Sequence, residues 1–279
     1  MTKDDKQNDL SVSGRLTPRK MRAMIPDNEI KTLTVSSDTF FHQKLADELA
    51  QWPGIEEVML WGTVSKAALR RLLSLAEIHE IYVMELQKHG NLHDIDPSSS
   101  LQIFRGGWLS ARDLRALAQL QNLKTLSAQN SFVNQQTIEM VVNSSTLTNL
   151  DLEASNLDDD MAKELAKSSR IVQLDVGATR LGPSGLQEIC KMRQLRELDI
   201  WALDLDEHDL DCLEELSNLE YLSVGGYDDQ ERLTSKNVLP RLAKLPSLRR
   251  VWLDGITITE SEAVELRARY ENAQITFVT

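Results

Sequence analysis

The sequence predicts an α/β solenoid of repeated units, in which parallel strands form one face and short helices form the other. Three observations lead to this fold class: an apolar phrase that recurs about every 24 residues, alternation within the phrase, and an apolar triplet at three-residue intervals behind it. One unit of this size cannot bury its own apolar face, but a stack of units can, so the period indicates a repeat architecture.

The strand phrase has the form Leu-x-x-Leu-x-Leu, and its alternation predicts a short strand. The triplet Leu186, Ile189 and Met192 predicts a short helix or 3₁₀ segment. Because strand and helix alternate, the strands must run parallel. Eleven phrases are found, and their middle apolar residues are Leu33, Val58, Ile81, Leu101, Leu126, Leu150, Leu174, Leu198, Leu222, Val251 and Ile275.

These repeats resemble the leucine-rich-repeat family over about residues 30–279. The resemblance implies a curved horseshoe, with about eleven parallel strands on the concave face and short helices on the convex face. The family often places Asn after the strand, where its amide satisfies backbone groups of the turn. Here a hydroxyl, which can do similar work, stands at the equivalent positions Thr63, Ser131, Ser155 and Thr179.

Three regions are predicted along the chain: a disordered tail over 1–9, an N-terminal cap over 10–29, and the leucine-rich-repeat domain over 30–279. Thr17 followed by Pro18 is typical of a helix N-cap with proline at the first helical position. The last strand phrase, around Ile275, has no helix behind it, so its edge could pair with a second copy in a homo-oligomer.

Composition limits the partners and the compartment. The formal net charge is −12, from 43 acidic and 31 basic residues, which disfavours nucleic acid and anionic membrane as partners. With no apolar signal segment and no long apolar run, the sequence predicts a cytoplasmic protein. Cys190 and Cys212 fall out of register between neighbouring repeats, so free thiols are expected rather than a disulfide.

Strand residues alternate, so the positions flanking the buried residues should lie on the concave face. Of 33 such positions, six are aromatic, which is several-fold more than elsewhere in the chain. Exposed aromatic side chains are typical anchors for protein partners, although aromatic residues also favour strands without any ligand. The predicted partner-binding residues are Trp61, Tyr82, Phe104, Asp151, Glu153, Asp175, Asp199, Trp201, Tyr221 and Trp252.

Asp151, Asp175 and Asp199 should form one column on three successive strands, about 4.8 Å apart. Such a column could attract a basic partner or a cation, or it could be an ordinary feature of the repeat. Metal-capable side chains also occur in the segments 225–232 and 89–96, but neither has the spacing of a known metal loop. No metal site and no cofactor is therefore predicted.

No catalytic motif is present: the sequence has no phosphate loop, no nucleophile elbow and no zinc spacing. The predicted function is a non-catalytic protein–protein interaction module that binds a protein with a basic or apolar surface, as an adaptor, scaffold or inhibitor. The alternative is a glycan-binding or carboxylate-dependent glycan-processing protein that uses the same face, since sugars stack on aromatic rings and glycosidases use two acids.

Overall fold

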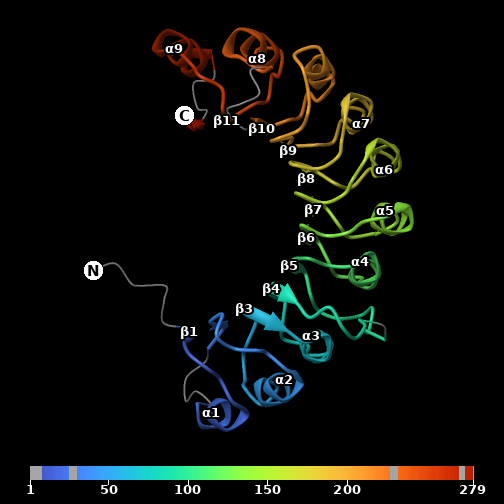
Figure 1. Cartoon of the computed structure of the whole chain (residues 1–279), viewed down its shortest axis with the longest axis vertical. Helices are drawn as coiled ribbons and strands as arrows, with labels where there is room; N and C mark the ends of the chain where they lie inside the picture. The colour runs from blue at the N-terminus through green and yellow to red at the C-terminus, as the bar shows by residue number, and fades with distance from the viewer. Residues whose placement is uncertain (1–7, 25–29, 93, 227–231, 270–273, 279) are drawn as a thin grey trace. The chain divides into compact units, whose positions relative to one another are not determined.

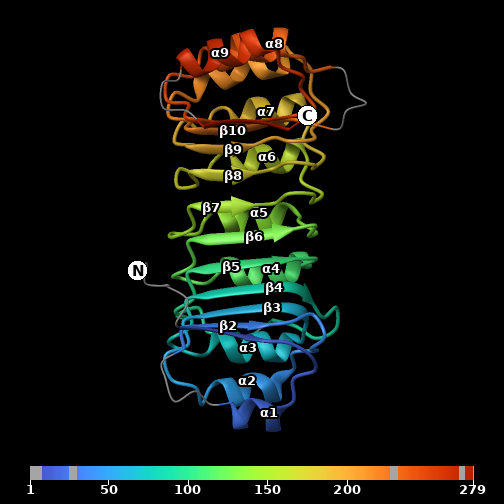
Figure 2. The same cartoon turned by 90° about the vertical axis from the view of Figure 1, so that its left-hand side faces the viewer.

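The structure is a computed structural model that describes residues 8–24, 30–92, 94–226, 232–269 and 274–278. The chain forms two compact units: unit 1 consists of Met1–Ala128 and Ser144–Leu147, and unit 2 of Gln129–Asn143 and Thr148–Thr279. Within each unit the strands lie on one side and the helices on the other (Figures 1 and 2). We call the strand side opposite the helices the open face.

Unit 1 alternates strands with short helices. Leu33 of β2 lies beside Val58 of β3, and Val58 lies beside Ile81 of β4, in parallel pairs. All three side chains are fully buried, as the repeat pattern predicts. The elements of unit 1 are β1 (Asp9–Val12), α1 (Pro18–Ala23), β2 (Thr32–Val35), α2 (Gln43–Leu49), β3 (Glu57–Val64), α3 (Lys66–Leu73), β4 (Glu80–Leu86), β5 (Ile103–Gly107), α4 (Ala111–Ala118) and β6 (Thr125–Gln129).

Unit 2 repeats the same plan in shorter strands. Leu150, Leu174 and Leu198 lie side by side on three parallel strands and form its buried column. The elements of unit 2 are α5 (Gln135–Val142), β7 (Asn149–Asp151), α6 (Asp159–Leu165), β8 (Gln173–Asp175), α7 (Pro183–Ile189), β9 (Glu197–Asp199), η2 (Asp209–Glu215), β10 (Tyr221–Gly225), α8 (Ser235–Leu242), β11 (Arg250–Asp254), α9 (Glu260–Arg269) and β12 (Gln274–Val278). The fold class is thus a leucine-rich-repeat solenoid.

Three of the four hydroxyl side chains predicted to follow the strands bind the backbone of their own turns, whereas Thr63 lies within β3 and donates to the side chain of Glu85 at 2.9 Å. The Thr179 hydroxyl donates to the carbonyl of Val176 at 2.7 Å, and the Ser131 hydroxyl donates to the carbonyl of Gln129 at 3.2 Å. Ser155 Oγ accepts from the backbone N–H of Leu157 at 3.3 Å. At these three turns the hydroxyl therefore does bind the backbone, as the sequence predicts.

The predicted N-terminal cap contains two elements. In α1, the side chain of Thr17 accepts from the backbone N–H of Lys20, and Pro18 is the first helical residue, as predicted. Met21 of this helix is buried. The strand β1, which begins at Asp9, pairs in parallel with β2 and adds one strand before the eleven that the phrases predict.

The register of β5 differs from the prediction. The phrase assigned Leu101 to the strand column, but Phe104 lies beside Ile81, and Phe104 is fully buried. The prediction that Phe104 lies on the open face and binds a partner is therefore wrong. The physical reason is an exchange of volume: the Phe104 ring fills the space where Gly106 has no side chain, 2.9 Å from where a Cβ would be. Gly106 stands at the position where other repeats have the last apolar residue of the phrase, so the residue pattern does not mark the register of this strand.

The two cysteines form a disulfide, which corrects the expectation of free thiols. Cys190 ends α7, whereas Cys212 lies within the 3₁₀ helix η2, and their Cα atoms are 5.9 Å apart. The sequence spacing compares the two segments as if they were the same kind of helix, but Cys190 follows an α-helix and Cys212 lies in a 3₁₀ helix, and the two helix types have different numbers of residues per turn. Because disulfides are rare in reducing compartments, the pair weighs against the predicted cytoplasmic location.

Reduction of this disulfide should destabilise unit 2. The bond closes a chain segment with a sequence separation of 22 residues, and a loop of that size corresponds to about 3 kcal/mol. We expect Cys212→Ser, and wild type in reductant, to lose this amount in urea unfolding. Thiol titration of the unfolded, unreduced wild type should detect no free cysteine. Two titratable thiols, together with unchanged stability in reductant, would contradict the assignment.

Candidate functional site

On the open face of unit 2, polar and aromatic side chains lie in columns that run across the strands. The pairing register places Asp151, Asp175 and Asp199 beside one another on β7, β8 and β9, so the predicted alignment is confirmed. The same column continues with Ser223 on β10 and Trp252 on β11. One column therefore passes from three carboxylates to an indole ring.

Each aspartate of the column also has a structural role. One carboxylate oxygen, Oδ1, accepts a backbone N–H two residues further on: Asp151 from Glu153 at 3.0 Å, Asp175 from Gly177 at 2.9 Å, and Asp199 from Trp201 at 2.8 Å. These bonds turn the chain out of the strand after three residues. One oxygen of each aspartate therefore has a structural role in its turn, in line with the interpretation of these residues as an ordinary feature of the repeat.

The chain then passes through a left-handed residue after each of these turns. Ala154, Ala178 and Ala202 have φ values of 55°, 52° and 54°. Their backbone N–H groups donate to carbonyls of the next repeat at 2.7 to 2.9 Å, so the strained residues are held by the stack. The turn geometry is therefore repeated, and it fixes where each aspartate side chain begins.

A pocket of about 320 Å³ opens on this face. Its lining residues are Glu153, Asp175, Asp199, Trp201, Tyr221, Ser223, Trp252 and Asp254. The pocket therefore has carboxylates on β8 and β9 and aromatic rings toward β10 and β11. Gly177 keeps space open beside it, since a Cβ there would lie 3.3 Å from the Oδ1 atoms of both Asp175 and Asp199.

The aromatic side of the pocket is partly fixed and partly exposed. The indole nitrogen of Trp201 donates to Asp254 Oδ2 at 2.6 Å, across 53 residues of sequence. That bond holds the Trp201 ring in place before any ligand arrives. Trp252 is 38% exposed, so part of its indole ring is accessible to a ligand.

The carboxylates of the pocket share a crowded, half-buried environment. Burial and, to a smaller extent, the neighbouring carboxylates of Asp199, Asp151 and Glu153 together raise the pKa of Asp175 to about 8, against a lowering effect from the Gly177 N–H. Burial likewise raises the pKa of Asp199 and that of Glu153. These three carboxyl groups therefore remain protonated to a higher pH than free carboxyl groups do.

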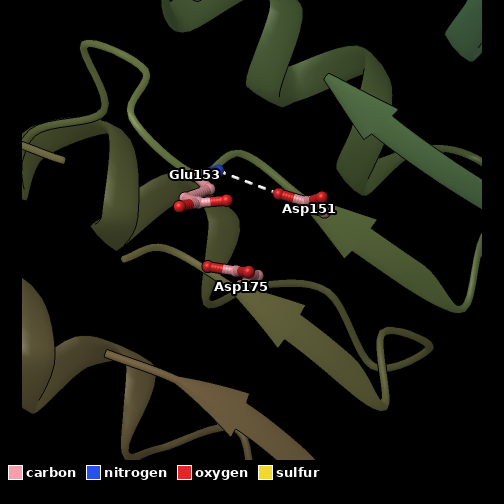
Figure 3. Close-up of side chains that lie close together, drawn as sticks. All are labelled: Asp151, Glu153 and Asp175. Carbon is pink, nitrogen blue, oxygen red and sulfur yellow. Dashed lines mark hydrogen bonds between the residues drawn. The ribbon is translucent and has the colours of Figure 1, made fainter. Parts of the chain in front are cut away.

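Three carboxylates approach closely enough to hold a cation. One oxygen each of Asp151, Glu153 and Asp175 lies within 4.8 Å of the other two, and Figure 3 shows the three side chains gathered at the ends of β7 and β8. Oxygen ligands of this kind suit hard cations such as Ca²⁺. Burial, together with repulsion from neighbouring carboxylates, raises the pKa of Glu153 and that of Asp175. The cluster alone does not define a metal site.

The predicted residues of unit 1 lie on a different part of the chain. Trp61 and Tyr82 pack together with ring centroids 4.8 Å apart, and the Tyr82 hydroxyl donates to the sulfur of Met84 at 3.3 Å. Trp61 and Met84 are 45% and 50% exposed. These residues form an aromatic patch on the open face of unit 1.

Some residues of the site were not among those predicted. Asp254 and Ser223 occupy open-face positions in the sequence pattern, but their strands lie 24 or more residues from the aspartates, so no local signal links them to the pocket. The acidic segment at 225–232 lies outside the described residues over 227–231, and His93 of the segment 89–96 is also outside them. In the described part of the segment 89–96, Asp96 accepts from the backbone N–H and from the hydroxyl of Ser98.

Comparison with known proteins places the fold. No family model matches the sequence, and no curated protein matches it. The structure is similar to the crystal structure of an internalin from Listeria monocytogenes strain 4b F2365, with a TM-score of 0.51 and 15% sequence identity over 90% of this chain and 81% of that chain. At this identity the likeness supports the leucine-rich-repeat fold. In the described part of the chain, no helix is long and apolar enough to cross a membrane.

Proposed function

We propose that the chain is a non-catalytic module that binds a protein partner on the open face of unit 2, as an adaptor, scaffold or inhibitor. The observation that carries this proposal is the pocket beside Trp252, where an exposed indole, a fixed indole and several carboxylates meet on one surface. Rigid aromatic side chains bury a large area at a small entropic cost, which makes them frequent hot spots of protein interfaces.

The Trp61 and Tyr82 patch of unit 1 is a second candidate contact for the partner. A basic or apolar partner surface fits the net charge of −12. Nucleic acid and anionic membranes, which repel that charge, fit poorly. A homo-oligomer formed through β12, the last strand of unit 2, is a further possibility of the same proposal.

The test is affinity capture with three tryptophan variants. The double variant Trp201→Ala, Trp252→Ala should lose the specific partner, with affinity at least 30-fold weaker, because each hot spot contributes about 2 kcal/mol or more. Trp108→Ala is the matched control, since Trp108 is 67% exposed and does not line the pocket. Trp61→Ala asks whether unit 1 contributes. Equal recovery of every captured protein by wild type and the double variant would contradict the proposal.

The glycan alternative is favoured by one observation. Asp175, with its pKa raised to about 8, lies near a second carboxylate and two tryptophans, and a protonated acid beside a carboxylate is what a glycosidase requires. This function predicts quenching or enhancement of tryptophan fluorescence by oligosaccharides, and release of reducing ends. If a panel of oligosaccharides produces neither signal, the alternative is excluded.

A further inference from the structure

The pocket of unit 2 is rich in hydrogen-bond acceptors and has no cationic side chain of its own. Among the described residues that line it there is no lysine, arginine or histidine. One oxygen of Asp175 and one of Asp199 already accept backbone N–H groups, and Ser223 also donates to Asp199. Each of these carboxylates can accept further hydrogen bonds, and both line a pocket whose other walls include aromatic rings.

The neighbouring column of the same face shows how this surface binds a cation. Glu197, Tyr221 and Arg250 lie side by side on β9, β10 and β11. Arg250 Nη2 donates to Glu197 Oε1 at 2.7 Å, while its guanidinium carbon lies 5.0 Å from the centroid of the Tyr221 ring. A guanidinium on this sheet is therefore held by a carboxylate and an aromatic face together.

The pocket column also holds a carboxylate and an aromatic ring, but it has no arginine. Asp199 follows Glu197 two residues along β9, and Trp252 follows Arg250 two residues along β11. The ring therefore lies on the strand that carries the arginine in the neighbouring column, and β10 carries Ser223 in place of Tyr221. Asp175 adds a second carboxylate on β8. What is missing is a planar group with several N–H donors, and guanidinium is the side chain that has this chemistry.

We propose that this pocket receives an arginine side chain of the protein partner, whose guanidinium is bound by Asp175 and Asp199 and stacks against Trp252. The inference rests on the proposed function, because it names the anchor of that interface. Arginine suits the site better than lysine, since its flat, weakly hydrated fork can donate to two carboxylates and lie on an indole at once. The raised pKa of Asp175 fits a carboxyl group that lacks a cationic neighbour.

The experiment uses the full chain labelled with 5-fluorotryptophan, whose five fluorine signals correspond to the five tryptophans. The probe is N-acetyl-arginine amide, titrated at pH 8.5 so that most Asp175 is ionised. Trp201 and Trp252 should shift, whereas Trp61 and Trp108 in unit 1 should not. N-acetyl-citrulline amide, which has the same shape without the charge, should bind at least tenfold more weakly, and so should the norleucine analogue.

Two variants assign the effect to the pocket. Asp175→Asn should weaken the arginine probe at least fivefold while keeping the side-chain volume. Asp160→Asn, on the exposed surface of α6 in the same unit, should leave it unchanged. Far-ultraviolet circular dichroism confirms that both variants fold.

Each other outcome overturns the inference. Equal binding of arginine and citrulline removes the role of charge. N-acetyl-lysine amide is titrated as a further probe, and equal binding of it removes the preference for guanidinium. A response to CaCl₂ in place of arginine would make the carboxylates a metal site. If no arginine-specific shift occurs but the double tryptophan variant still loses its captured partner, this inference fails and the proposed function stands. If the partner is retained as well, both fail.

Discussion

Replacing Asp113 by alanine is expected to lower the free energy of unfolding by about 3–5 kcal/mol, because the change leaves a buried ammonium without its partner. Lys66 Nζ lies 2.8 Å from both carboxylate oxygens of Asp113, and the two side chains are only 7% and 3% exposed. Asp113 also closes the capping box of α4, where it accepts from the hydroxyl of Ser110 at 2.6 Å. One substitution therefore removes an ion pair and a helix cap.

The position of this pair explains why it is buried. The described residues between β4 and β5 form no helix, so α4 is the next helix along the chain after α3 (Figure 1). Lys66 begins α3 and reaches Asp113 across that interval, and Gly90 of the connecting segment covers its side chain, with a Cβ placed there 3.7 Å from Lys66 Cβ. The connector between β4 and β5 is thus accompanied by a specific polar link between α3 and α4.

Urea unfolding of the matched exposed pair provides the control. Lys31 and Glu56 also form an ion pair, but their side chains are 43% and 46% exposed, so Glu56→Gln should cost less than about 1 kcal/mol. In a double-mutant cycle, Lys66→Met should cost much less in the Asp113→Ala background than in wild type. If Asp113→Ala costs no more than Glu56→Gln, the pair does not stabilise unit 1 as described.

The stability of unit 2 should fall as pH rises toward 8. The pKa of Asp175 is raised from 3.8 to about 8, so the folded state holds a proton that the unfolded state has released. Its contribution to stability is therefore fully present below about pH 4 and is lost as pH rises through about 8. A single proton of this kind changes the free energy of unfolding by at most about 1.4 kcal/mol per pH unit.

Asp175→Asn should make the pH dependence of unfolding shallower between pH 5 and 8 and should raise stability at pH 8. Asparagine keeps an oxygen for the Gly177 N–H but does not ionise. A residual slope is expected because burial also raises the pKa values of Asp199 and Glu153. Urea titrations from pH 5 to 9 measure this, with Asp160→Asn as the reference. Identical slopes in the two variants would show that Asp175 is not the group concerned.

Several features were determined by the sequence alone. The 24-residue period determined the repeat fold, and the alternation of Leu150 with Asp151 determined which side chains are buried and which lie on the open face. The signal was strong because strand geometry puts successive residues on opposite faces, and every repeat enforces the same choice. Thr17 and Pro18 likewise determined the start of α1 through local backbone geometry alone.

Other features were decided only by the tertiary structure. The register of Phe104 depends on the space left by Gly106 on the same strand, and the disulfide depends on the distance of 5.9 Å between the Cα atoms of Cys190 and Cys212 in neighbouring repeats. The pocket depends on Trp201 meeting Asp254 across 53 residues. These contacts depend on how volumes and distances match between repeats. A residue pattern records which face a side chain takes, but it does not record how far the neighbouring chain lies from it.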